Sequence, residues 1–302
     1  MTTAPTPRPS PVRPSPVSAA APKEPAAPTT RFEIKPREIR DRAPIILFNA
    51  VEGWGKTTLG ASAPSPLIAM SGNETGYDTL LSHGLVPQVP ALVLNTYPDA
   101  LALVRQLTAD PQGIKTFVPD AVGGFEALCR EYVCQRDFGG DWSDGGFNSF
   151  GKGVDAVGRE WRVFLSALEQ LRDRQNVQVL MLGHVKTEKF KNPTGTDYDR
   201  YASDLDKRVW GLTAKFCDAV LFGRFYESVD VAKSEQKKGS ADRKGKAIGE
   251  AQRVVVTERR DGFDAKNRFG MPGEVWIKGQ PQDMYSEIWE HITGTQENND
   301  AE

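Results

Sequence analysis

The run Gly53-Trp54-Gly55-Lys56-Thr57-Thr58 constrains the fold of this chain more than any other segment. A phosphate-holding loop needs glycines so that backbone N–H groups can turn toward the anion, a lysine for the β- and γ-phosphates, and a hydroxyl for Mg²⁺. The run supplies all three, follows the apolar segment 45–48 and opens a predicted helix at Thr57. Ala50 stands where the usual pattern G-x-x-x-x-G-K-[ST] has its first glycine. We predict that Ala50 and the run bind ATP, with Thr57 as a Mg²⁺ ligand, rather than forming an ordinary glycine-rich turn.

Short apolar runs alternate with longer amphipathic segments from Pro44 onward. This alternation is typical of a mostly parallel sheet flanked by helices and predicts an α/β fold. Apolar residues that recur every three or four positions between 157 and 171 predict a helix that lies on the sheet. The predicted strands are 45–49, 67–71, 115–119, 177–183, 219–225, 253–258 and 274–278, and further helices are predicted near 204–216 and 283–291.

The chain is expected to form one ATPase domain with a tail at each end. Residues 1–30 are rich in Pro, Ala, Ser and Thr and lack periodicity, which predicts a disordered tail. Residues 31–292 show no internal repeat or second core pattern, so they are assigned to the single domain. Within it, residues 231–252 carry a basic run and are predicted to form a mobile loop or hairpin, and residues 293–302 form an acidic tail.

Composition sets limits on partners and location. The 302 residues are 39% hydrophobic, and the formal net charge of -2 gives no overall attraction to nucleic acid, so any such contact must be local. No apolar run approaches the roughly 20 residues that span a bilayer. Prolines occupy the N-terminal region where a signal peptide would be apolar, so we expect a cytoplasmic protein with no membrane partner. Three cysteines without zinc spacing are expected to be buried free thiols.

Two carboxylates and a histidine follow predicted strands and are candidates for chemistry at the γ-phosphate. Asp120 is placed to hold Mg²⁺ with its water shell. Glu74 is the candidate base for an attacking water. His184 ends a strand at the sheet edge where ligands collect in such folds. The alternatives are a strand-ending turn aspartate, a solvated loop glutamate and a structural histidine.

Several segments together resemble the RecA superfamily. Lys266-Asn267-Arg268-Phe269-Gly270 looks like the signature of its RadA-like branch, and Gly183-His184-Val185-Lys186 and Ser71-Gly72-Asn73-Glu74 are similar to further segments of that branch. Asn192-Pro193-Thr194-Gly195, with Tyr198, Asp199, Arg200 and Tyr201 downstream, and Ala265 before the Lys-Asn-Arg run resemble the phage single-strand annealing ATPases of the Sak-four type. The chain lacks the zinc-finger cysteines of RadA proteins, so the phage group fits better.

This resemblance implies a RecA-like P-loop core and a role for each matching residue. Glu74 becomes the base that activates water, and His184 becomes the sensor that reports the γ-phosphate to a DNA-binding loop. Lys266 and Arg268 become fingers that reach the active site of a neighbouring subunit. A homo-oligomeric ring or filament with active sites at subunit interfaces, acting in host cytoplasm if phage-encoded, is therefore expected.

The segment after His184 carries basic and aromatic residues that suit single-stranded DNA. Basic side chains track phosphates and aromatic rings stack on bases. The candidates are Lys186, Lys189, Phe190, Lys191, Arg200 and Tyr201. The alternative is a solvated loop, because aspartates and glutamates dilute the charge. Residues 137–153 are another candidate loop, whose aromatic residues would either stack on bases or pack on the protein's own core.

We therefore expect an ATPase that binds single-stranded DNA and promotes annealing or strand pairing. A single-stranded-DNA-binding protein is a further candidate partner. The alternatives are a nucleotide-gated adaptor, such as a helicase loader, and a small-molecule kinase that uses the same phosphate loop. The dependence of ATP hydrolysis on single-stranded DNA separates these functions.

Overall fold

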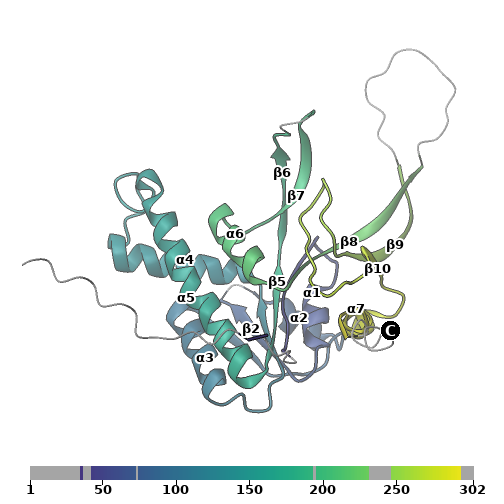
Figure 1. Ribbon diagram of the computed structural model, residues 1–302, viewed down its shortest axis with the longest axis horizontal. Coiled ribbons are helices and arrows are strands. Elements are labelled where there is room, and N and C mark those ends of the chain that lie inside the picture. Colours follow the sequence, from purple (N-terminus) through teal and green to yellow (C-terminus); the bar gives the residue numbers. More distant parts are fainter. Residues whose placement is uncertain (1–34, 37–41, 73, 193–194, 231–245, 294–302) are drawn as a thin grey trace, which may run out of the picture. The chain divides into compact units, whose positions relative to one another are not determined.

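The computed structural model describes residues 35–36, 42–72, 74–192, 195–230 and 246–293 (Figure 1). Three sequence predictions therefore lie wholly or mostly outside the described residues. These are the disordered tail 1–30, most of the basic segment 231–252, and the acidic tail 293–302 apart from its first residue.

The core is an eight-stranded sheet in the order β10-β9-β8-β1-β5-β4-β2-β3. The strands from β8 to β3 in this order pair in parallel, and β9 and β10 extend the sheet by antiparallel pairing. The predicted α/β class is confirmed. The strand bounds are β1 Ile45–Ala50, β2 Pro66–Ser71, β3 Ala91–Leu94, β4 Thr116–Asp120, β5 Gln178–Gly183, β8 Ala219–Asp230, β9 Lys246–Val256 and β10 Glu274–Trp276.

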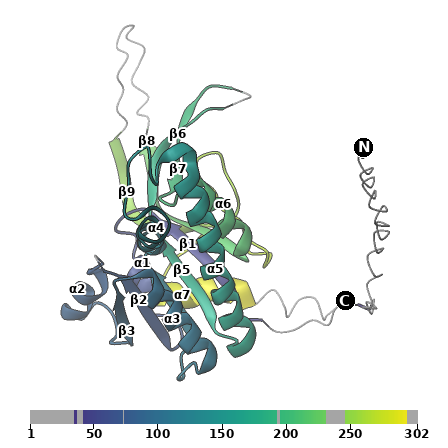
Figure 2. The ribbon, with the colours of Figure 1, turned by 90° about the vertical axis from the view of Figure 1, so that its left-hand side faces the viewer.

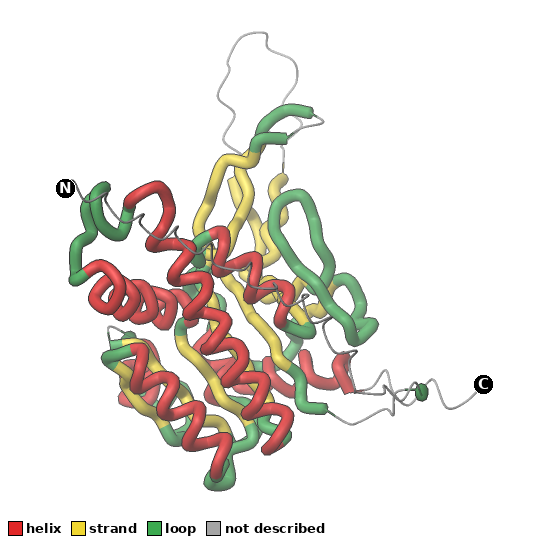
Figure 3. Tube along the Cα trace, turned by 60° about the vertical axis from the view of Figure 1, so that its left-hand side comes forward, coloured by secondary structure: helices red, strands yellow, loops and turns green. Residues whose placement is uncertain are grey.

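Helices cover both faces of the sheet because alternate side chains of each buried strand are apolar on opposite sides. Ile45 and Leu47 of β1 pack in the core cluster under one layer of helices, and Ile46 and Phe48 pack in the cluster under the other. The first layer, which Figure 3 shows over the strands, is the larger. It contains α3 Tyr97–Ala109, α4 Val122–Phe138, α5 Lys152–Gln175 and α6 Lys207–Phe216, and the second contains α1 Lys56–Ala61, α2 Gly76–Ser82 and α7 Met284–Thr293.

The remaining elements are short or stand apart from the main sheet. The 3₁₀ helices η1 Ser149–Gly151 and η2 Pro281–Asp283 precede α5 and α7. The strands β6 Val185–Phe190 and β7 Tyr198–Ser203 pair as a separate antiparallel hairpin. This hairpin follows β5 and extends beyond the end of that strand (Figures 1 and 2). The sequence predicts a loop for this segment, whereas the structure has two paired strands.

The three cysteines, Cys129, Cys134 and Cys217, are free and buried, so that prediction is confirmed. Burial raises the pKa of the Cys129 and Cys217 thiols to about 12 in each case. Both thiols are therefore held in the protonated, unreactive form.

Candidate nucleotide site

The phosphate loop joins the carboxyl end of β1 to the start of α1. Gly53 and Gly55 have φ values of 71° and 109°, a region that glycine adopts without the strain of a side chain. Ala50 is the last residue of β1, in register with Gly223, and its φ is not positive, so alanine fits there without backbone strain. Its departure from the usual pattern is accommodated by the strand itself.

Lys56 lies folded back across this loop. Its Nζ donates to the carbonyl oxygens of Ala50 at 3.2 Å and Val51 at 3.4 Å. Only 8% of the residue is exposed, and this burial lowers the lysine pKa, while the carboxylates of Asp120 and Asp204 act in the opposite direction. The ammonium is therefore held at the loop by weak acceptors that phosphate oxygens can replace.

The buried Trp54 side chain anchors the loop to the protein core. Its side chain is fully buried, with its ring centroid 4.7 Å from that of Phe48, and its indole N–H donates to the carbonyl of Arg224 at 3.1 Å. The carbonyl of Trp54 accepts from Arg253 Nε at 2.7 Å. The indole is thus committed to the protein core, and only the backbone of Trp54 remains for the phosphates.

Thr57, in the first turn of α1, contacts Asp120, the last residue of β4. Thr57 Oγ1 donates to Asp120 Oδ2 at 2.8 Å, and Asp120 is 6% exposed. Burial raises the pKa of Asp120, and the hydrogen bond from Thr57 opposes that rise. A hydroxyl beside a carboxylate offers the oxygen ligands that Mg²⁺ prefers, so Thr57 and Asp120 would hold this ion if it binds. Thr58 is the next residue of α1 and is buried.

Glu74 and His184 face each other across the same site. Glu74 Oε1 lies 3.8 Å from His184 Nε2, and both side chains are partly exposed. His184 follows β5, which lies between β1 and β4 in the sheet, so it emerges between the phosphate loop and Asp120. The structure thus brings together the residues that the sequence placed separately.

One further carboxylate, which the sequence did not predict, belongs to this group. Asp204, which follows β7, is largely buried, and its charge acts on Lys56, while His184 and Lys56 act on it in turn. In the sequence it was counted only among acidic residues that dilute a basic segment. The pairing of β6 with β7, which brings Asp204 back to His184, is the feature that places it here.

A family described as "AAA domain" matches residues 42–269, the segment that carries every element of this site. The chain belongs to that family. Membership makes the protein a P-loop ATPase by family and implies nucleotide binding.

Solved structures similar to this AAA domain include a RadB recombinase and the flagellar accessory protein FlaH from Methanocaldococcus jannaschii. The first is 13% identical with a TM-score of 0.40 and covers 80% of this chain and 90% of its own. The FlaH structure is 11% identical with a TM-score of 0.32, and the match covers 79% of this chain and 91% of the FlaH chain. A search of curated proteins found no match. Among the described residues, no helix is long and apolar enough to cross a membrane.

Lys266 and Arg268 of this AAA domain lie away from its phosphate loop. Lys266 pairs with Val220, near the start of β8, and its Nζ donates to the carbonyls of Ala214 and Cys217 at 2.6 Å each. These two carbonyls lie at the end of α6, so the Lys266 ammonium caps that helix within its own chain. Arg268 is different, since its side chain is 57% exposed and lies 3.6 Å from Asp218.

The DNA-binding candidates also separate. Arg200 is buried in an ion pair with Asp264, and its guanidinium lies 5.3 Å from the Phe190 ring centroid, so its side chain is engaged within the chain. Phe190 is half-buried and packs on Tyr198, with 5.2 Å between ring centroids. Four candidates keep exposed surface on the hairpin or at its end: Lys186, Lys189, Lys191 and Tyr201.

The loop between α4 and α5 has both a core-packed and an exposed aromatic residue, the two arrangements that the sequence left open. Phe147 is fully buried beneath Arg130, whereas Trp142 is 45% exposed and Phe150 is 99% exposed. Phe150 also has a φ of 47°, an unfavourable value for a residue with a side chain. The loop therefore packs one aromatic residue on the core and presents another to solvent.

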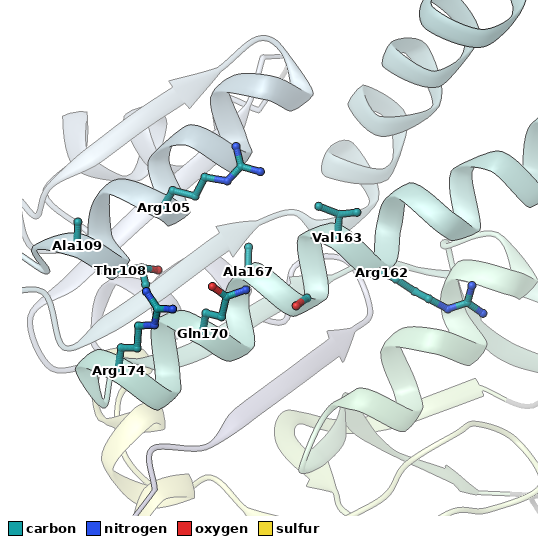
Figure 4. Close-up of a pocket in the computed structure, with 9 residues that line it drawn as sticks. Arg105, Thr108, Ala109, Arg162, Val163, Ala167, Gln170 and Arg174 are labelled. Atoms are coloured by element: carbon teal, nitrogen blue, oxygen red, sulfur yellow. The ribbon is translucent and has the colours of Figure 1, made fainter. Parts of the chain in front are cut away.

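A groove of about 450 Å³ lies elsewhere, between α3 and α5 (Figure 4). Arg105 extends from α3 and Arg174 from α5, and neither comes from the phosphate loop or from the carboxyl end of a strand. The nucleotide site is thus distinct from this groove, which is lined by Arg105, Thr108, Ala109, Arg162, Val163, Ser166, Ala167, Gln170 and Arg174.

Proposed function

We propose that this chain is an ATP-hydrolysing recombination protein of the phage type that binds single-stranded DNA and promotes annealing or strand pairing. One observation carries the proposal. The Thr57–Asp120 pair, Lys56 and the Glu74–His184 pair lie together at the carboxyl ends of the parallel strands, and a hairpin with exposed lysines begins directly after His184. Groups suited to hydrolysis and groups suited to a phosphate backbone therefore share one edge of the molecule.

In the proposed hydrolysis each of these residues has one task. Lys56 leaves the carbonyls of its own loop for the β- and γ-phosphate oxygens, and Thr57 and Asp120 would hold Mg²⁺, which would supply charge neutralisation. Glu74 takes a proton from the water that attacks the γ-phosphorus as the bond to the β-phosphate oxygen breaks. His184, 3.8 Å from Glu74, orients that carboxylate and senses the γ-phosphate.

We place single-stranded DNA along the hairpin and the α4–α5 loop. Lys189 and Lys191 supply exposed cations, and Phe150 supplies a fully exposed ring for stacking. The helix α6, which follows the hairpin, connects the two elements, because Arg208 at its start lies beside Gly151 of the loop and pairs with Asp155 of α5. The full exposure of Phe150, at a φ that is unfavourable for a residue with a side chain, favours a contact with a partner over core packing.

The position of Arg268 supports a role in a neighbouring subunit. Arg268 lies beside Asp218, which accepts from the backbone N–H of Ile45 at the amino end of β1. The phosphate loop starts at the other end of that strand, about 17 Å away for its six residues. Arg268 therefore cannot reach its own nucleotide, and a head-to-tail assembly would present it to the next one. We assign Lys266, in contrast, to capping α6.

The rate of ATP hydrolysis with and without a single-stranded oligonucleotide tests the proposal, with Lys56→Ala as the inactive control. We expect DNA to stimulate hydrolysis and specific activity to rise with protein concentration. A nucleotide-gated adaptor would bind ATP with little turnover in either condition, and a kinase would turn over only with a small acceptor. Either result would contradict the proposal.

Mixing two inactive variants tests the shared site. Glu74→Gln lacks the base and Arg268→Ala lacks the finger, so a mixed interface can pair an intact base with an intact finger. Hydrolysis should partly return in the mixture. If it stays as low as in each parent although mixed oligomers form, Arg268 acts only within its own chain.

A further inference from the structure

The β6–β7 hairpin begins and ends at the nucleotide site. His184 precedes β6, and Asp204 follows β7. The backbone N–H of Asp204 donates to the carbonyl of His184 at 3.1 Å, and Lys186 Nζ donates to the carbonyl of Asp204 at 3.3 Å. Both ends of the hairpin are thus tied together at one point, next to the residues proposed to handle the γ-phosphate.

The carboxylate of Asp204 occupies a tight and incompletely satisfied position. It lies against the first turn of α4, where a Cβ added to Gly123 would overlap the carboxylate oxygens. Its Oδ1 is buried and accepts no hydrogen bond from the residues that the structure describes. Burial raises the pKa of Asp204, and the charges of His184, Lys186 and Lys56 oppose that rise. A buried acceptor without a donor is held at a cost, so a modest change in the nearby charges can displace it.

We propose that Asp204 is a positioning residue that fixes the returning end of the β6–β7 hairpin to the nucleotide site and moves that hairpin when the nucleotide state changes. Part of this inference rests on the proposed function, since it requires a nucleotide beside Lys56. The Lys56 ammonium turns toward the phosphates on binding, and their negative charge then repels the Asp204 carboxylate. His184 carries the signal into β6, and Asp204 carries it into β7, so the hairpin moves as one unit.

A dye on the hairpin measures this coupling directly, without DNA and without turnover. Lys191→Cys places a thiol on an exposed residue, whereas the native cysteines are buried and will not compete for the dye. The labelled chain is titrated with a non-hydrolysable ATP analogue, and nucleotide affinity is measured separately with a fluorescent analogue. We expect the dye emission to change as the nucleotide site fills.

Asp204→Asn should separate binding from response. Its nucleotide affinity should equal or exceed the parental value, because one negative charge near the phosphates is gone, whereas a merely structural loss would weaken binding. The equilibrium constant for the nucleotide-dependent movement of the hairpin should fall about tenfold, as for loss of one charge-assisted interaction, and the dye response should fall with it. Gly123→Ala, which displaces the carboxylate without removing it, should also reduce the response. The matched control is Asp199→Asn, an exposed carboxylate on β7 away from the hairpin base, and it should respond normally.

The outcomes are distinguishable. A full dye response in Asp204→Asn, or no dye response in a parent chain that binds nucleotide, overturns the inference about Asp204. A parent chain that binds nucleotide no better than Lys56→Ala overturns the proposed function itself, and with it the part of the inference that requires a nucleotide.

Discussion

Trp54→Phe tests whether the Trp54 side chain anchors the phosphate loop or contacts the nucleotide. The variant keeps a ring against Phe48 but removes the indole N–H, which donates to the Arg224 carbonyl at 3.1 Å. Leaving this part-buried acceptor unsatisfied costs about 1 kcal/mol, and the smaller ring adds a similar amount through imperfect packing. We expect the free energy of unfolding to fall by about 2 kcal/mol, which lowers Tm by about 4–8 °C in a domain of this size.

Thermal denaturation and titration with a fluorescent ATP analogue, both on Trp54→Phe, separate the two roles. Nucleotide affinity should stay within about threefold of the parent, a small change in binding free energy, because the indole does not face the phosphates. Trp289→Phe is a matched control. The Trp289 ring is partly buried and stacks on Tyr285, so this variant should lower Tm less than Trp54→Phe does. A parental Tm combined with a large loss of affinity would show that the Trp54 ring contacts the nucleotide and would refute the anchoring argument.

Five further changes are expected to have distinct effects. Lys56→Ala should abolish nucleotide binding in the analogue titration without unfolding the chain. Unchanged hydrolysis would show that the phosphate-loop assignment is wrong. Glu74→Gln should bind ATP but release phosphate roughly 10²–10⁴-fold more slowly, and a parental rate would place the base elsewhere. Lys189→Ala should weaken oligonucleotide binding in fluorescence anisotropy and lower its salt slope by about one, whereas Arg200→Gln should mainly lower Tm; equal losses of DNA affinity would contradict this contrast. Removing residues 1–30 should leave phosphate release unchanged, because a proline-rich segment supplies no catalytic geometry, and a large loss would show that it contributes to the site.

The sequence predicted the buried parallel strands best. All residues of β1 and β5 are buried, and such strands appear in a sequence as continuous apolar runs. The β6–β7 hairpin escaped prediction because its six-residue strands are mostly polar and pair with each other rather than with the main sheet. The helices α3 and α4 were not predicted either, although both pack on the same core cluster as α5.

The candidate site was predictable only where its residues are local in the chain. The glycines, Lys56 and Thr57 are neighbours in one motif, and a short motif carries its own geometry. Lys266 and Arg268 resemble each other in the sequence, yet one caps α6 and the other is exposed beside Asp218. Only the antiparallel pairing of Lys266 with Val220 separates them, and no local pattern encodes that pairing.

The loop that grips the phosphates is itself held by strands that lie far along the chain. Trp54 bonds to Arg224 of β8, and Arg253 of β9 bonds back to Trp54, across separations of 170 and 199 residues. Met284 at the start of α7 packs against Gly55, close enough that an added Cβ would lie 2.9 Å from its Cε. A ligand that stabilises the loop conformation must therefore also stabilise the contacts of β8, β9 and α7 with that loop, because binding energy is shared by every element that the bound form requires. The strand β9, which extends the parallel core by antiparallel pairing, thus belongs to the nucleotide site through the contact of Arg253 with the loop.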